Sequence, residues 1–142
     1  MIRNYLPSDK NSFSRLYIES NIKGQAYLSP EFWQADCQEV VNQYFPQATT
    51  FLYEDKNKVV GTISLIENEI GGLFVSPSQW GQGIGSALID DVKTHHSTLH
   101  LKVFTKNHRA LSFYQKNGFE IRQNGICQVT GLAEYDMFWA AT

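Results

Sequence analysis

Long apolar runs and cysteines are scarce in this 142-residue sequence, and each scarcity excludes a class of protein. No apolar stretch approaches the roughly 20 residues of a membrane-spanning helix, and the first residues lack the apolar centre of a leader peptide. The cysteines, Cys37 and Cys127, lie far apart without C-x-x-C spacing, which predicts free thiols. We therefore expect a cytoplasmic protein that has no membrane association.

Metal-binding patterns and basic clusters are also lacking. The histidines, at positions 95, 96, 100 and 108, have neither the spacing nor the acidic neighbours of a metal site, so we expect no metal. A pI of about 6.0 without a concentrated basic segment disfavours a nucleic-acid partner. The net charge of −2 divides into −5 for residues 1–92 and +3 for residues 93–142. The basic second half would suit a ligand that carries phosphates, and the acidic first half would suit a cationic acceptor. Surface charge without a role explains the division almost as well.

Hydrophobic residues make up 42% of the chain and aromatic residues 13%, enough for one substantial core. We expect a single domain over residues 1–142. Periodicity and turn residues predict strands near 2–6, 49–54, 58–66, 69–75, 99–103, 119–129 and 134–139, and helices near 8–21, 30–45, 84–96 and 107–117. Gly71-Gly72 within the strand at 69–75 predicts a bulge or a close backbone approach, unless the glycines only relieve crowding.

The most informative segment is Gly81-Gln82-Gly83-Ile84-Gly85-Ser86, where a strand passes into an amphipathic helix. Glycines expose backbone amides, and the first N–H groups of a helix lack partners and carry the positive end of its dipole. The spacing matches neither the dinucleotide fingerprint, whose third glycine is replaced by Ser86, nor the P-loop, which requires Gly-Lys-Ser/Thr. The segment therefore predicts an anion site of another type, or else a purely structural turn.

A second segment, residues 107–119, reads as a capped helix followed by a strand. Its form is N-x-x-A-x-x-F-Y-x-x-x-G-F, given by Asn107, Ala110, Phe113, Tyr114, Gly118 and Phe119. Together the two segments resemble the GCN5-related N-acetyltransferase (GNAT) superfamily, in particular its small bacterial single-domain members. The phosphate-binding motif of that superfamily, Q/R-x-x-G-x-G/A, is matched at Gly83 and Gly85, whereas Trp80 stands where Gln or Arg is usual.

The resemblance implies an α/β (α+β) fold with a mixed, mostly antiparallel seven-stranded sheet. The sheet is splayed between its fourth and fifth strands and carries about four helices on its two faces. The resemblance also implies acetyl-CoA as co-substrate. The implied cofactor-binding residues are Leu73, Phe74, Val75, Gly81, Gln82, Gly83, Ile84, Gly85, Ser86, Asn107 and Tyr114. A backbone N–H near Leu73 or Phe74 would face the thioester carbonyl and stabilise its oxyanion.

Acyl transfer to an amine requires two proton movements. Tyr114 occupies the family position of the general acid, and the ordinary pKa of tyrosine, roughly 10, is close to that of a thiol. Glu69 is the expected general base, in a position from which some family members recruit a glutamate through water. Glu67 is a second candidate, on the same strand face as Glu69 unless a turn intervenes. Other members use a glutamate on the following strand, where this chain has Lys102.

The resemblance implies an N-acetyltransferase that acts on a primary amine, which is a small amine, a peptide N-terminus or a protein lysine. The alternative is a non-catalytic acetyl-CoA-binding sensor or regulatory module. Residues 21–33 resemble the segment that lines the acceptor cleft of small bacterial relatives, so Tyr27, Phe32 and Trp33 either line a pocket or belong to the core. Met137–Trp139 is expected to be a final core strand or a dimer surface. The chain is accordingly expected to be a monomer or a homodimer.

Overall fold

The computed structural model describes all residues, 1–142, as a sheet with helices on both faces. The strands are β1 (Ile2–Asn4), β2 (Thr49–Asp55), β3 (Lys58–Ile66), β4 (Glu69–Val75), β5 (Thr98–Phe104), β6 (Glu120–Ile126) and β7 (Ala133–Ala140). The α-helices are α1 (Lys10–Gly24), α2 (Pro30–Glu39), α3 (Ile84–Lys93) and α4 (His108–Lys116). Short helical turns are η1 (Pro7–Asp9), η2 (Val40–Tyr44), η3 (Phe45–Gln47) and η4 (Pro77–Gln79). The predicted order of helices and strands is confirmed.

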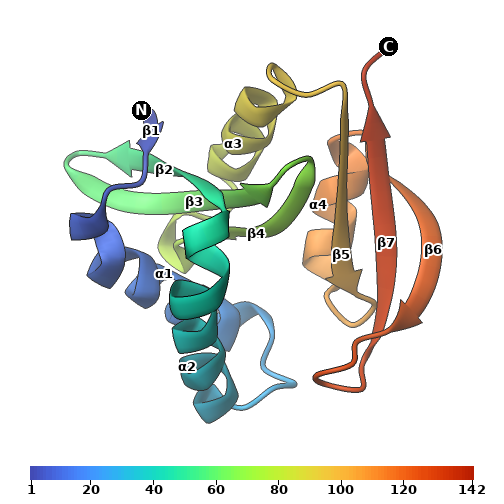
Figure 1. Cartoon of the computed structure of the whole chain (residues 1–142), viewed down its shortest axis with the longest axis horizontal. Coiled ribbons are helices and arrows are strands. Elements are labelled where there is room, and N and C mark those ends of the chain that lie inside the picture. Colours follow the sequence, from blue (N-terminus) through green and yellow to red (C-terminus); the bar gives the residue numbers. More distant parts are fainter.

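The seven strands form one mixed sheet in the order β1-β2-β3-β4-β5-β7-β6. All neighbouring strands are antiparallel except β4 and β5, which are parallel. In Figure 1 the strands β2 to β4 run across the page, whereas β5, β7 and β6 run up it. The sheet therefore has two parts, which turn away from each other where β4 meets β5.

The junction between β4 and β5 is short. Only Glu69 with His100 and Ile70 with Leu101 are paired across it, so the later residues of the two strands diverge. Within β4 the register against β3 shifts between Ser64 and Leu65, which leaves Gly71 as an extra residue. The bulge predicted for the two glycines is confirmed, and it lies at the point of divergence.

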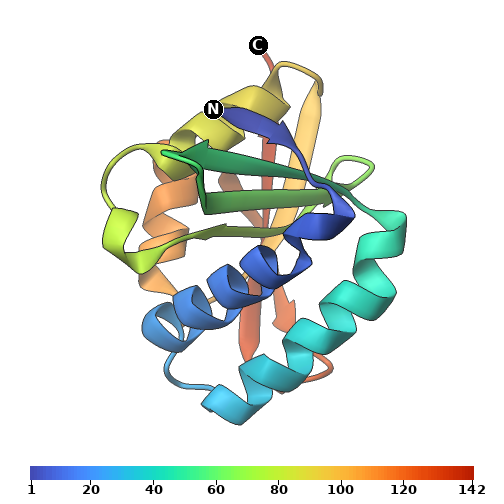
Figure 2. The ribbon, with the colours of Figure 1, turned by 90° about the vertical axis from the view of Figure 1, so that its left-hand side faces the viewer.

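Two separate hydrophobic clusters cover the two faces of the sheet. The larger contains 14 buried residues and includes the apolar face of α3 together with Tyr114 of α4. The smaller is made by Phe13 and Tyr17 of α1 with Trp33 and Cys37 of α2. Figure 2 shows α1 and α2 side by side across the strands. The face covered by α1 and α2 is thus rich in aromatic rings, which bears on the site described below.

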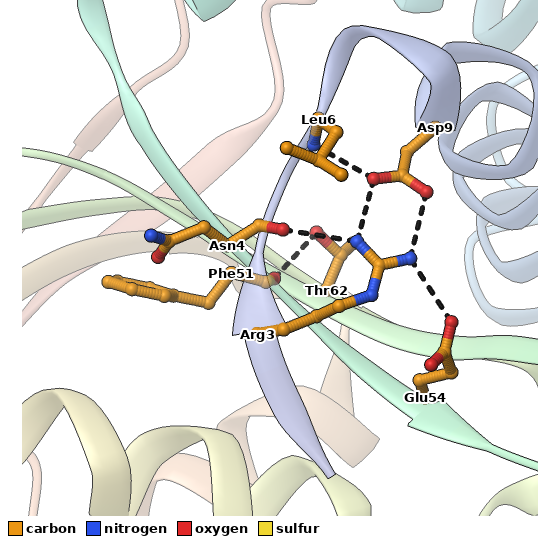
Figure 3. Close-up of polar contacts among 7 residues, drawn as sticks. All are labelled: Arg3, Asn4, Leu6, Asp9, Phe51, Glu54 and Thr62. Atoms are coloured by element: carbon orange, nitrogen blue, oxygen red, sulfur yellow. Dashed lines mark hydrogen bonds and ion pairs between the residues drawn. The ribbon is translucent and has the colours of Figure 1, made fainter.

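The N-terminal strand is fastened by a cluster of polar groups around Arg3 (Figure 3). The guanidinium donates to both carboxylate oxygens of Asp9, at 2.8 and 2.9 Å, and to Glu54 at 3.2 Å. The backbone N–H of Leu6 also donates to Asp9, at 2.8 Å. The hydrogen bonds from Arg3 hold the pKa of the Asp9 carboxyl below its usual range. One arginine therefore ties β1 to the start of α1 and to the end of β2.

The second helix differs from the prediction in its final third. The α-helix begins at Pro30, after Ser29 accepts a hydrogen bond from the Phe32 N–H, but it ends at Glu39 instead of continuing to residue 45. A π-helical turn and a short 3-10 helix follow, and Pro46 within the latter has no N–H to extend an α-helix. The π-helical turn places Tyr44 beside β4. None of the helices in this fold has both the length and the apolar character that spanning a membrane requires.

Candidate active site

A cavity of about 600 Å³ lies where β4 and β5 diverge. It is lined by Gly71–Val75 from β4 and by Lys102–Phe104 from β5, and its volume is typical of a small-molecule site. Of the eleven residues that the sequence predicts to bind a cofactor, ten line it: Leu73, Phe74, Val75, Gly81, Gly83, Ile84, Gly85, Ser86, Asn107 and Tyr114. The remaining one, Gln82, is exposed and lies outside the lining.

The glycine-rich turn forms one wall of the cavity. Gly81 and Gly83 have φ values of +82° and +84°, which favour glycine, and a Cβ at either position would meet no atom within 4 Å. Open space therefore lies over their backbone, directly before the first turn of α3. Gly85 has another role, because a Cβ there would lie 3.0 Å from the Phe113 ring. Two glycines thus shape an open cradle at a helix N-terminus, and the third lets α4 approach α3.

Trp80, the departure from the usual motif, is part of the same wall. Its indole N–H donates to the Val75 carbonyl at 2.8 Å, and the Arg109 guanidinium carbon lies 3.5 Å from its ring centroid. Arg109 comes from the first turn of α4 and also lines the cavity. Trp80 is uncharged at the position where Gln or Arg is usual. A positive charge is supplied there by Arg109 of α4, which was not among the predicted cofactor-binding residues.

Asn107 and Tyr114 project into the cavity from α4. The Asn107 side-chain oxygen caps the helix by accepting from the Ala110 N–H at 3.3 Å, as predicted, which leaves its NH₂ group available to a ligand. Tyr114 is buried, with 8% of its surface exposed, and lines the cavity. Burial raises the pKa of the Tyr114 phenol, and the nearby Arg109 charge partly opposes the rise. A protonated phenol therefore faces the cavity.

The two predicted base candidates lie outside the cavity lining. Glu67 has φ +53° in the turn between β3 and β4, so the turn separates it from Glu69, the first residue of β4. Glu69 is half-buried near Tyr44, a residue that the sequence analysis did not single out. Burial raises the pKa of Tyr44 to about 12, with a further contribution from Glu69. The buried hydroxyl of Tyr44 has no hydrogen-bond partner. A Cβ at Gly71 would lie 2.0 Å from this hydroxyl, so only glycine fits at the bulge.

The wall formed by α1 and α2 contains further residues that sequence reasoning missed. Tyr17 and Asp36 line the cavity and are joined by a hydrogen bond from the phenol to the carboxylate. Phe32 and Trp33, predicted as pocket or core, line it as well, whereas Tyr27 does not and packs on Phe104. A helical spacing of three and four residues from Trp33 and Phe32 to Asp36 is the signal that could have placed the carboxylate on the same face.

The open mixed sheet with a cavity between its parallel central strands agrees with the fold that the resemblance to the N-acetyltransferases implied. A family model described as "Acetyltransferase (GNAT) domain" matches residues 46–121. The chain belongs to this family.

Individual relatives agree with the family assignment. Peptidyl-lysine N-acetyltransferase YiaC of Escherichia coli (strain K12) is 32% identical, over 98% of this chain and 96% of its own length. Peptidyl-lysine N-acetyltransferase YjaB of Salmonella typhimurium is 31% identical, over 73% of this chain and 67% of its own. The PaiA N-acetyltransferase of Thermoplasma acidophilum, solved in complex with coenzyme A, superposes with a TM-score of 0.84 at 20% identity, covering 99% and 98% of the two chains. The chain is an N-acetyltransferase.

Proposed function

We propose that this chain transfers an acetyl group from acetyl-CoA to the side-chain amine of lysine in a peptide or protein. The observation that carries the proposal is one continuous cavity that contains both an anion cradle at the start of α3 and the protonated phenol of Tyr114. The choice of lysine is supported by the relatives that are named peptidyl-lysine N-acetyltransferases. A small amine or a peptide N-terminus is the competing acceptor.

The cavity wall fits acetyl-CoA, which supplies the activated acetyl group as a thioester. The open backbone of residues 81–86 would bind the diphosphate, with Arg109 adding a positive charge beside it. The free NH₂ group of Asn107 would donate to the pantetheine arm, which would lie along Leu73–Val75. A backbone N–H near Leu73 or Phe74, just after the bulge, would donate to the oxygen that becomes negative during transfer.

The chemistry requires the lysine nitrogen to bond the thioester carbon while the carbon–sulfur bond breaks. We assign Tyr114 as the acid that gives its hydroxyl proton to the departing sulfur. We assign Glu69 as the base that receives the proton lost by the amine. Because Glu69 does not line the cavity, this proton would reach it through water near the Gly71 bulge.

Replacement of Tyr114 by Phe tests the proposal. We expect kcat for a lysine peptide to fall about a hundredfold, because the leaving sulfur loses its proton donor while the ring still fills its place. The measurement is thiol release from acetyl-CoA with lysine peptides, polyamines, aminoglycosides and amino acids. Tyr53→Phe is the matched control, since Tyr53 is a partly buried tyrosine on β2 outside the cavity. Equal rates in wild type and Tyr114→Phe would reject Tyr114 as the acid.

Two further outcomes bear on the remaining assignments. Glu69→Gln should shift the pH dependence of kcat if Glu69 receives the amine proton, and an unchanged profile would reject that role. Tight binding of acetyl-CoA by the wild type without turnover of any amine would reject the proposed function and favour a sensor.

A further inference from the structure

The carboxylate of Asp36 has an unusual environment for a charged group. It lies half-buried on α2, lines the cavity, and has one hydrogen-bond partner on the chain, the hydroxyl of Tyr17. No lysine, arginine or histidine pairs with it, because the only two side-chain ion pairs of the chain both involve Arg3. Its negative charge is therefore uncompensated.

Four aromatic residues line the same cavity as this carboxylate, and one of them, Tyr17, is bonded to it. The centroid of the Tyr17 ring lies 4.8 Å from that of Phe74 and 6.1 Å from that of Trp33, and the Trp33 and Phe32 centroids are 5.1 Å apart. All four rings line the cavity. The Trp33 N–H is already bonded to the Gln25 carbonyl at 3.2 Å, so the tryptophan offers the cavity only its ring. Aromatic rings attract cations through the negative potential of their faces.

The bond between Tyr17 and Asp36 could simply join α1 to α2, but a neutral acceptor would serve that purpose equally well. A carboxylate has about four acceptor positions, of which the Tyr17 hydroxyl occupies one. Partial burial of an unpaired charge is costly unless a cation binds there. The group that fits is a primary ammonium, which is compact, carries three N–H donors and is attracted by both the carboxylate and the rings.

We infer that Asp36 is the anchor that receives the protonated amine of the acceptor lysine, with Tyr17 orienting its carboxylate. This inference rests on the proposed function and adds a residue that selects the acceptor. The other carboxylate in the cavity lining, Glu134, belongs to β7 on the opposite part of the sheet. Asp36 only binds the ammonium, and the proton that the amine loses before attack passes to Glu69.

The test is steady-state kinetics of Asp36→Asn with a lysine peptide. Asparagine has the same shape and can still accept the Tyr17 hydrogen bond, so the fold should be retained. We expect KM for the peptide to rise about ten- to a hundredfold, with kcat at saturating peptide nearly unchanged. Affinity for acetyl-CoA, measured by calorimetry, should not change. Glu39→Gln is the matched control, because Glu39 lies three residues further along α2, exposed and outside the cavity.

A weakly basic amine that is neutral at the assay pH, such as trifluoroethylamine, provides the second readout. Its turnover should be the same in wild type and Asp36→Asn, so the preference for cationic amines should be lost in the variant. Tyr17→Phe should raise the peptide KM by a smaller factor, because the carboxylate remains but is no longer oriented.

Several outcomes would overturn the inference. One is a peptide KM for Asp36→Asn equal to that of Glu39→Gln and wild type. Another is a large fall in kcat at unchanged KM, which would make Asp36 a proton acceptor. If Asp36→Asn fails to fold, Asp36→Glu keeps the charge and should retain a KM within about tenfold of wild type. Absence of any wild-type turnover would reject the proposed function instead, which separates the two failures.

Discussion

Two aspartates in neighbouring parts of the fold have opposite environments. Asp9, just before α1, accepts two hydrogen bonds from the Arg3 guanidinium and one from the Leu6 N–H. Asp36, on α2, accepts only one, from Tyr17, and has no cationic partner. Both are partly or largely removed from water, but only Asp36 lines the cavity.

The difference separates a carboxylate that stabilises the fold from one that is available to a ligand. The charge of Asp9 is matched within the chain, and the pairing fastens β1 and α1 to β2. The charge of Asp36 is left for a molecule that arrives from outside. Neutralising each aspartate should therefore affect a different property of the protein.

The largest effect on stability is expected for Arg3→Ala. Removal of the guanidinium leaves the carboxylate of Asp9, a residue that is 8% exposed, without its cation, which should lower the free energy of unfolding by about 2 kcal/mol. Urea denaturation measures the change. Arg15→Ala is the control, because Arg15 is exposed on α1 and forms no ion pair. Catalytic constants at a temperature where both variants are folded should match those of wild type.

A smaller effect is expected when the unfolding free energies of wild type and Arg3→Ala are compared at acidic pH. The pKa of Asp9 is lowered in the folded state, so its pairing stabilises the fold only while the carboxylate is ionised. The difference in unfolding free energy between wild type and Arg3→Ala should be complete above about pH 5. It should shrink as the pH falls through about 4, the unfolded value, toward the lower folded value. A difference that stays constant from neutral pH to pH 2 would contradict this account of Asp9.

The smallest effect on stability is expected for Asp36→Asn. Its free energy of unfolding should lie within about 0.5 kcal/mol of wild type, because the variant keeps the Tyr17 hydrogen bond and loses only an unpaired charge. Thermal and urea unfolding measure this directly. A loss comparable to that of Arg3→Ala would make Asp36 a structural residue and remove the contrast between the two aspartates.

The parts of the site that could be predicted are those encoded within short segments. The cradle at residues 81–86 and the capped helix after Asn107 depend on local backbone conformation and helix spacing, so their residues were found from sequence. The bulge at Gly71 followed from paired glycines in a strand. The order of strands in the sheet could be predicted only through the family resemblance.

The parts that could not be predicted depend on contacts between distant segments. Asp36 becomes informative only when α2 packs beside α1 and brings Tyr17 to it, 19 residues earlier in the chain. The basic character of the segment around Arg109 could be seen in the sequence, but its stacking on Trp80, which belongs to another element, could not. The π-helical turn that places Tyr44 against Gly71 spans only Val40–Tyr44, a segment too short for hydrophobic periodicity to distinguish it from an α-helix.

The most direct test of the central claim is the mass of a lysine peptide after incubation with acetyl-CoA and the wild-type chain, with fragmentation to locate the modified atom. A blocked N-terminus on the peptide leaves the lysine side chain as its one amine. The account predicts one acetyl group on the lysine nitrogen, formed much more slowly by Tyr114→Phe and unaffected by Tyr53→Phe. An unmodified peptide, in the presence of a chain that binds acetyl-CoA, would contradict it.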